Sequence, residues 1–328
     1  MRLIRRLFLL LLLSVALLAG TMGYYATRPL ELPSLPFEFS ISQGASLKVA
    51  ARQMQQAGVL PNDLMFVWLA RVLGKSTQLK AGNYELGAAL TPLELLDMLT
   101  QGRVTQSELA IIEGSTFNQL RATLNANAAI RHVTAALSEA EIMQRIGAAE
   151  GLAEGLFFPD TYYFASGTSD LALLKRAYQT MQKRLLESWQ TRTQGLPLET
   201  PYQALILASI VEKETGQAKD RGMIAGVFIN RLRKGMLLQT DPTVIYGIGE
   251  KFDGNLRRSD LQTDTPYNTY TRAGLTPTPI ALPGLAALQA TLHPAQTDAL
   301  FFVARGDGSS EFSATLEQHN RAVNRYQR

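Results

Sequence analysis

The sequence of 328 residues predicts an α+β protein with an N-terminal transmembrane helix. Three observations support this: an uncharged apolar run near the N-terminus, a short stretch that mixes strand and helix patterns, and a mainly helical remainder that ends in a β-hairpin pattern. Hydrophobic residues make up 46% of the chain, which excludes an intrinsically disordered protein. The predicted divisions are a cytoplasmic tip and transmembrane anchor over residues 1–28, a linker over 29–36, a small module over 37–103 and a main domain over 104–328.

The N-terminal run from Leu7 to Thr27 carries no charge and would span about 31 Å as a helix, roughly the hydrocarbon thickness of a bilayer. Three arginines precede this run and only Arg28 follows it closely, which predicts a cytoplasmic N-terminus and a periplasmic body. We therefore expect a single-pass protein of the cell inner membrane. A cleaved signal peptide is the alternative, although no A-x-A cleavage site follows the run.

A spacer and a small α+β module follow the anchor. Pro29, Pro33 and Pro36 predict a stiff spacer between the membrane and the module. Apolar spacing then predicts a strand, two helices, a second strand and a third helix, at Phe37–Ile41, Leu47–Ala57, Leu64–Leu73, Leu79–Leu86 and Leu93–Leu99. This order resembles the LysM-like module that precedes some cell-wall enzymes.

The main domain is predicted to be mostly helical. A strand at Ser107–Ile112 leads into a helix that ends at Leu124, and further helices are predicted at Ser169–Trp189, Pro201–Thr215, Met223–Leu232 and Leu316–Tyr326. Residues 237–283 show little periodicity and predict a long loop, which inside a compact domain is usually functional. The segments Leu300–Ala304 and Glu311–Ser313 flank Gly306-Asp307-Gly308 and predict a hairpin.

Composition and missing motifs exclude several classes of protein. The chain has no cysteine, so disulfides and thiol catalysis are impossible, and its three histidines are too scattered for a zinc-binding HExxH motif. The net charge of +4 comes without a basic block, which argues against a nucleic-acid partner. Serine-hydrolase, transpeptidase and P-loop motifs are absent. We expect neither a metal nor a cofactor.

Two carboxylates stand at the end of the predicted buried helix. Glu212 and Glu214 point about 200° apart on a helix and cannot act on one centre. Apolar surroundings and the negative end of the helix dipole raise a carboxyl pKa, as a general acid for glycosidic cleavage requires. Spacing alone does not choose between the two residues, and a pair of solvated helix-end glutamates remains the alternative.

Several separated motifs surround this pair and carry a resemblance to a known family. They are Glu154-Gly155-Leu156-Phe157-Phe158-Pro159-Asp160-Thr161-Tyr162, Val211-Glu212-Lys213-Glu214-Thr215, Val227-Phe228-Ile229-Asn230-Arg231-Leu232, Leu238-Gln239-Thr240-Asp241-Pro242, Tyr267-Asn268-Thr269-Tyr270 and His293-Pro294. Together they resemble the endolytic murein transglycosylases, which are membrane-anchored enzymes of bacterial cell-wall synthesis. The resemblance runs from Phe37 to the C-terminus. The segment Gly274–Ile280 departs from the Gly-Leu-Pro-Pro-Gly-Pro pattern of that family, which leaves the conformation of this loop open.

The resemblance implies a lysozyme-like catalytic domain and a set of site residues. The catalytic glutamate falls on Glu214, with Glu212 in a supporting role. The saccharide-binding residues that it implies are Asn230, Gln239, Asp241, Tyr246, Asn268 and Tyr270. From the residues alone, an Asp-Pro turn start for Asp241 and a core position for Tyr246 remain alternatives.

A single acid suits a lytic transglycosylase, whose substrate supplies its own nucleophile. The implied reaction cuts glycan strands internally between N-acetylmuramic acid and N-acetylglucosamine and leaves 1,6-anhydro ends. The implied partners are peptidoglycan strands, the inner membrane and the peptidoglycan synthases (penicillin-binding proteins). Two alternatives stay open: a hydrolytic muramidase with Asp241 as second carboxylate, and a non-enzymatic scaffold that binds glycan through the LysM-like module.

Overall fold

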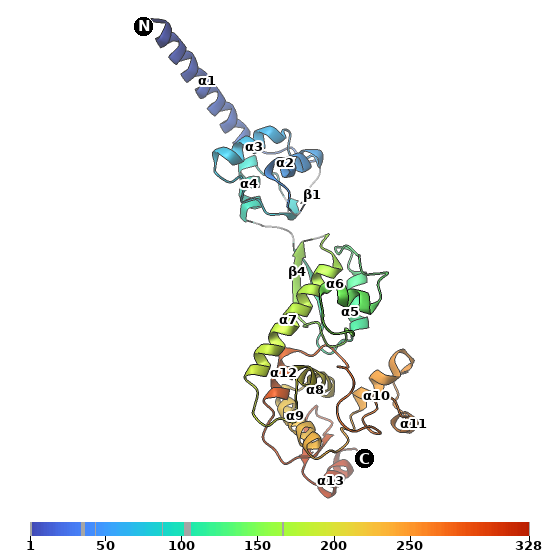
Figure 1. Cartoon of the computed structure of the whole chain (residues 1–328). Coiled ribbons are helices and arrows are strands. Elements are labelled where there is room, and N and C mark those ends of the chain that lie inside the picture. The colour runs from blue at the N-terminus through green and yellow to red at the C-terminus, as the bar shows by residue number, and fades with distance from the viewer. Residues whose placement is uncertain are drawn as a thin grey trace. The chain divides into compact units, whose positions relative to one another are not determined.

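The computed structural model of the chain describes residues 2–33, 37–42, 44–86, 88–101, 106–165 and 167–327 (Figure 1). These residues form thirteen α-helices and three two-stranded sheets. The chain divides into two compact units, which we call unit 1 (Met1–Ser107 with Tyr163–Gly167) and unit 2 (Glu108–Tyr162 with Thr168–Arg328). Pro36 of the predicted linker and the predicted boundary between Arg103 and Val104 lie outside the described residues.

Unit 1 contains the long N-terminal helix and a strand-helix-helix-strand-helix module. Its elements are α1 (Arg2–Thr27), β1 (Phe37–Ile41), α2 (Leu47–Gln56), α3 (Asp63–Val72), β2 (Gly82–Leu86) and α4 (Pro92–Gln101). The Ser46 and Asn62 side chains accept backbone N–H groups and cap α2 and α3. β1 pairs antiparallel with β2, with Phe37 opposite Leu86. The order of elements predicted for the module is confirmed.

Helix α1 is part of the core of unit 1 and does not end at a free spacer. Tyr25 and Ala26 of α1 are buried together with Leu30, which follows the helix. The Leu30 N–H donates to the carbonyl of Leu90 at 2.8 Å, and the Tyr25 hydroxyl donates to the carbonyl of Asn62 at 3.3 Å. The apolar end of the helix therefore packs directly on the module, although the prolines predicted a stiff segment between them.

Unit 2 is mainly helical and is built around one buried helix. Its elements are β3 (Gln106–Ala110), α5 (Phe117–Ala126), α6 (Glu139–Ile146), β4 (Thr161–Ala165), α7 (Asp170–Gln190), α8 (Pro201–Glu214), α9 (Ala218–Arg233), α10 (Asp241–Ile248), the 3₁₀ turn η1 (Gly249–Lys251), α11 (Arg258–Gln262), α12 (Leu285–Leu292), β5 (Phe301–Ala304), β6 (Ser310–Ser313) and α13 (Leu316–Tyr326). Strands β3 and β4 each have residues in both units. Every residue of α8 from Ala204 to Val211 is buried. Helices α7, α9 and α12 pack against it, as their positions around α8 in Figure 1 show.

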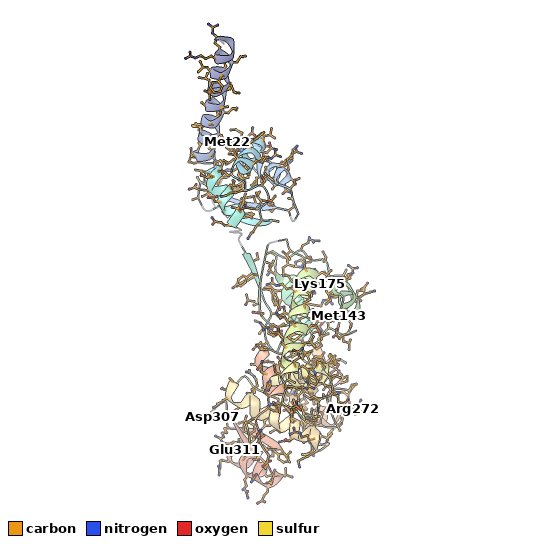
Figure 2. The ribbon with its side chains drawn as sticks, turned by 60° about the vertical axis from the view of Figure 1, so that its left-hand side comes forward. Met22, Met143, Lys175, Arg272, Asp307 and Glu311 are labelled. Atoms are coloured by element: carbon orange, nitrogen blue, oxygen red, sulfur yellow. The ribbon has the colours of Figure 1, made fainter. Side chains whose placement is uncertain are left out.

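The C-terminal hairpin is confirmed by the pairing of β5 with β6. The strands are antiparallel, with Phe301 opposite Ser313. Gly306 and Gly308 both have positive φ in the connecting turn, and the Asp307 carboxylate accepts the Ser309 N–H at 2.8 Å. Asp307 lies in this turn and Glu311 on β6, and both are labelled in Figure 2.

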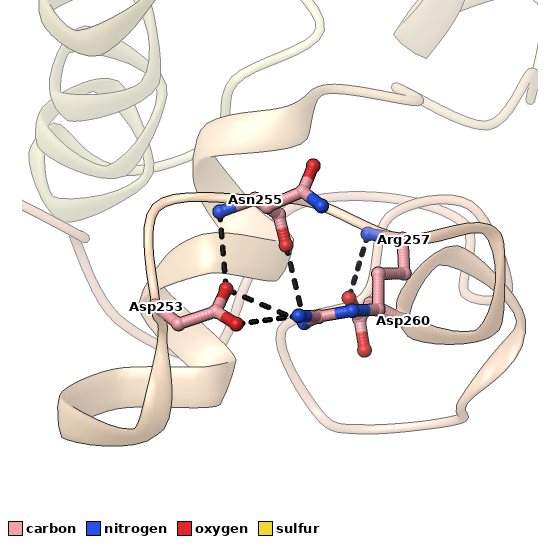
Figure 3. A network of polar contacts seen from close by, with 4 residues as sticks. All are labelled: Asp253, Asn255, Arg257 and Asp260. Carbon is pink, nitrogen blue, oxygen red and sulfur yellow. Dashed lines mark hydrogen bonds and ion pairs between the residues drawn. The ribbon is translucent and has the colours of Figure 1, made fainter.

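The segment predicted as a long loop, residues 237–283, contains the short helices α10 and α11 in the structure. Between them, Arg257 holds the chain in place through an ion pair with Asp253 at 2.5 Å (Figure 3). Its backbone N–H donates to Asp260 at 2.7 Å, and the Asn255 N–H donates to Asp253 at 3.1 Å. Helices of five to eight residues are too short to show apolar periodicity, so the sequence pattern did not reveal them.

Candidate active site

Glu214 is the last residue of α8, and the helix determines where its carboxyl group lies. Thr200 caps the N-terminus of α8 and Pro201 occupies its first turn, which favours a helix start at this point. The eight buried residues 204–211 then fix the helix in the core. Ser209 adds a polar contact between α8 and the segment before α12, because its hydroxyl accepts the Ile280 N–H at 3.0 Å. A partly buried carboxyl group therefore stands at the rigid end of the central helix of unit 2.

The hydroxyl of Thr240 donates to the Glu214 carboxylate. Thr240 is the N-cap residue of α10, yet its side chain caps no N–H of that helix and is directed at Glu214 instead. Burial raises the pKa of Glu214 to about 7, opposed by the Thr240 hydrogen bond and assisted by the negative charge of Asp241. A carboxyl group with this pKa is partly protonated at neutral pH, as a proton donor must be.

The turn that carries Thr240 is held in a strained conformation. Among the described residues other than glycine, only Gln239 has a positive φ, of 49°. Its N–H donates to the carbonyl of Thr269 at 3.1 Å, and the Thr240 N–H donates to the Thr269 hydroxyl at 3.1 Å. Backbone strain of this kind persists only where surrounding contacts impose it. Here these contacts fix the Thr240 hydroxyl toward Glu214 and leave the Gln239 side chain exposed.

Asp241 and Tyr270 meet beside this turn. The Tyr270 hydroxyl donates to Asp241 Oδ1 at 2.5 Å. Burial and the neighbouring Asp241 carboxylate raise the pKa of Tyr270. Arg231 lies 7% exposed and donates to the carbonyls of Leu237 and Leu238, at 3.2 and 2.8 Å. The structure thus brings the predicted residues Asp241 and Tyr270 near Glu214, and the predicted residue Gln239 directly precedes Thr240, which contacts Glu214.

Two of the predicted saccharide-binding residues, Asn268 and Asn230, form hydrogen bonds with backbone carbonyls. Asn268 is 1% exposed, its amide donates to three backbone carbonyls, and its oxygen accepts the Tyr270 N–H at 2.8 Å. These contacts give Asn268 a structural role in holding its own loop, and its predicted contact with a sugar stays a prediction. The Asn230 amide donates to the carbonyls of Thr297 and Ala299, at 2.7 and 3.1 Å, and ties α9 to the chain before the hairpin.

Tyr246 pairs with a buried glutamate that the sequence did not single out. Its hydroxyl donates to Glu154 Oε2 at 3.1 Å, and its ring packs edge-on against Tyr267. Glu154 is 8% exposed and also accepts the Phe117 N–H at 3.0 Å. Burial raises the pKa of Glu154 to about 7. The sequence signal for Glu154 was its position in one of the motifs that carry the family resemblance. Its contact with Tyr246 of α10 makes Glu154 a candidate positioning residue.

Glu212 points to a different part of unit 2 from Glu214, as the helical spacing predicts. Its carboxylate accepts the Gly284 N–H at 2.9 Å. Burial raises the pKa of Glu212, and the nearby negative charge of Glu113 adds to the rise. The adjacent Lys213 ammonium donates to the carbonyl of Gly114 at 3.1 Å. These contacts join the end of α8 to the segments before α5 and α12, so Glu212 supports the position of Glu214.

Comparisons with known proteins agree on one family. The profile of the YceG-like family matches residues 39–325. A protein of Bacillus subtilis (strain 168) named endolytic murein transglycosylase is 30% identical over 304 residues, which cover 88% of this chain and 84% of the relative. A protein of the same name from Streptococcus pneumoniae serotype 2 (strain D39 / NCTC 7466) is 30% identical and longer, so the match covers 86% of this chain and 57% of that protein.

A solved structure gives the same result for the fold. The crystal structure of a YceG-like protein from Listeria monocytogenes matches with a TM-score of 0.54 and 29% identity, and the match covers 87% of this chain and 98% of that one. The family profile spans the module as well as the segment with Glu214 and its neighbours. Because profile, relatives and solved structure converge over nearly the whole sequence, the chain belongs to the YceG-like family.

Proposed function

We propose that this chain is an endolytic murein transglycosylase, a lyase that cuts glycan strands between N-acetylmuramic acid and N-acetylglucosamine. The observation that carries the proposal is Glu214, a carboxyl group with a pKa of about 7 at a rigid helix end. Its nearest polar partner is the uncharged Thr240 hydroxyl. Two relatives that bear this activity in their names support it.

In the proposed reaction Glu214 acts first as an acid and then as a base. Its proton passes to the glycosidic oxygen as the bond to C1 of N-acetylmuramic acid breaks. The resulting carboxylate then takes the proton from the C6 hydroxyl of the same sugar, whose oxygen bonds to C1 and closes a 1,6-anhydro ring. Water is neither consumed nor released, and Glu214 regains its proton. Asp241 and Tyr270 beside the acid, and the exposed Gln239 side chain next to Thr240, offer groups suited to sugar hydroxyls.

The location of the protein is part of the proposal. Helix α1 contains a span, Arg5–Thr27, that is long and apolar enough to cross a membrane. Since three arginines precede the uncharged run Leu7–Thr27 and one directly follows it, we propose a cytoplasmic N-terminus and a periplasmic body in the inner membrane. Recovery of a shortened, soluble protein from cells would favour the signal-peptide alternative.

The finer assignments of the domains and partners complete the proposal. We assign residues 37–103 to a LysM-like module and residues 104–328 to a lysozyme-like catalytic domain. An enzyme anchored beside the synthases of the membrane would cut nascent strands and so end their elongation. The order strand-helix-helix-strand in the module supports the first assignment, and the buried helix that ends at Glu214 supports the second.

Mass spectrometry of the products tests the reaction class. Purified protein with uncrosslinked glycan strands should release fragments that end in 1,6-anhydro-N-acetylmuramic acid and span many lengths early in digestion. Asp241→Asn should lower the rate without changing the product. Asp241 lies close enough to raise the pKa of Glu214, so hydrolysis is the specific rival. Products with reducing ends, abolished by Asp241→Asn, would show that water is the nucleophile and would reject the transglycosylase proposal.

The pH dependence of the rate should report the pKa of Glu214. The acid must start protonated, so kcat/KM should fall as the pH rises through about 7. The Thr240 hydroxyl stabilises the charged form, so Thr240→Val should move this fall to higher pH by about one unit, the size expected for a lost hydrogen bond to a charged group. Thr263→Val, which removes an exposed hydroxyl bonded to Ser259, is the control. A profile unchanged by Thr240→Val would contradict this role of Thr240.

A further inference from the structure

A groove of about 810 Å³ lies in unit 1 between α1 and the module. Leu17 and Gly20 of α1 form part of its wall, and Pro61 before α3 and Met65 in its first turn line it from the module. Its charged lining residues are Arg28 and Glu31, which both follow the end of α1. The groove therefore has an apolar part along the helix and a charged part beyond the helix end.

The position of Leu17 in the helix sets the depth of this groove. Leu17 precedes the last residue of α1, Thr27, by ten residues, which corresponds to about 15 Å along a helix. Leu17 and Gly20 belong to the span that is apolar enough to cross a membrane. The groove therefore extends from this apolar span to the start of α3, which contacts α1 near its end through the hydrogen bond from the Tyr25 hydroxyl to the carbonyl of Asn62.

The outer face of α3 is apolar as well. Leu64, Trp68 and Val72 follow a spacing of four residues and are 57%, 57% and 70% exposed. Phe66 and Ala70 on the inner face are fully buried, so the module uses that face for its own core. An aromatic residue beside an apolar stripe, with Arg71 over the Trp68 ring at 5.9 Å, is typical of a helix at a membrane interface.

From these contacts we propose that unit 1 binds a membrane phospholipid, with an acyl chain in the groove and α3 embedded at the interface. The proposal rests on the proposed anchoring of α1 in a membrane. The apolar wall suits an acyl chain. The Arg28 guanidinium and the Glu31 carboxylate, 3.7 Å apart, offer opposite charges to the phosphate and the ammonium of a zwitterionic headgroup. The module then lies within the lipid surface and moves with α1 as one body.

Tryptophan fluorescence tests the position of α3, because the chain has only two tryptophans. The full-length Trp189→Phe protein, reconstituted in phosphatidylethanolamine–phosphatidylcholine vesicles, reports on Trp68 alone. Lipids brominated on their acyl chains should quench most of its emission, while aqueous iodide should have little effect. Leu64→Glu with Val72→Glu should reduce the bromine quenching. Leu186→Glu, an equally exposed leucine on α7, is the matched control.

Photo-crosslinking tests the groove itself. Phosphatidylcholine with a diazirine on its acyl chain should form adducts on the peptide that contains Pro61 and Met65, in addition to adducts on α1. A side chain at Gly20 meets no atom within 4 Å and would project from a groove-lining position, so Gly20→Phe should lower the adducts on α3. Gly23 is equally open but is absent from the described groove lining, so Gly23→Phe should leave them unchanged.

An alkaline carbonate wash of the same vesicles separates the two proposals. Extraction of the protein would show that α1 is not an anchor and would reject the proposed location. Retained protein with Trp68 open to iodide, and with adducts confined to α1, would reject only the lipid site. Protection of Trp68 that appears only after other membrane proteins are added would show a protein partner on α3 and would also overturn the lipid site.

Discussion

Replacement of Glu214 by glutamine should lower turnover on glycan strands by at least about 100-fold, the size typical for loss of a general acid. Glutamine keeps the shape of the side chain, and its oxygen can still accept the Thr240 hydroxyl. It cannot donate a carboxyl proton or take one back, so both steps of the proposed reaction are lost. Release of 1,6-anhydro fragments, measured by mass spectrometry over time, gives the rate.

Glu212→Gln is the matched control, because it makes the same change two residues earlier on α8. Its oxygen can still accept the Gly284 N–H, so we expect a smaller loss that comes from support of the helix end. A larger loss for Glu212→Gln than for Glu214→Gln would show that the acid has been assigned to the wrong residue. No release of fragments by the native protein or by either variant would favour the non-enzymatic scaffold.

A comparison of the stability of the Glu214→Gln protein with that of the native protein should detect the raised pKa of Glu214 independently of activity. The folded protein raises the pKa of Glu214 from 4.5 to about 7, so it binds this proton more tightly than the unfolded chain does. The contribution to stability is complete below pH 4.5 and is lost as the pH rises through about 7. Glu214→Gln should therefore gain stability relative to the native protein between pH 5 and about 8, measured by urea unfolding.

The sequence predicted best where one local signal determines the structure. The apolar run of α8 and the glycine that follows it at position 216 placed Glu214 at a helix end, as the structure has it. The hairpin of β5 and β6 was likewise predicted from two short strands around Gly306 and Gly308. In each case the residues that determine the structure are close together in the sequence.

The contacts that complete the site are distant in the sequence and could not be predicted. The Thr240 hydroxyl reaches Glu214 across 26 residues, and Tyr246 reaches Glu154 across 92. Local propensity predicts that the Thr240 side chain caps α10, but in the folded protein its hydroxyl donates a hydrogen bond to Glu214. The contacts of Asn268 are short-range, since its amide donates to the backbone carbonyls of its own loop, and the sequence pattern did not indicate this structural role.

Gly155→Ala should lower the free energy of unfolding by roughly 2 to 5 kcal/mol, from the sum of a left-handed backbone strain and an overpacking cost. Gly155 has a φ of 80°, and a Cβ atom there would lie 2.3 Å from Cβ of Pro279 and 3.3 Å from the carbonyl oxygen of Ala281. The proline ring cannot rotate away, so the backbone would have to move. Urea unfolding measures the loss.

Gly151→Ala in the same segment separates this packing effect from a general intolerance of alanine. A Cβ at Gly151 meets no atom within 4 Å, so we expect almost no change in stability. Gly155 also adjoins Glu154, which holds Tyr246 of α10, the helix that begins beside Glu214. The activity of Gly155→Ala should therefore be lower than that of the native protein even at denaturant concentrations too low to unfold the variant. Equal stabilities for the two variants would mean that the chain at Gly155 does not approach Pro279 as closely as the structure indicates.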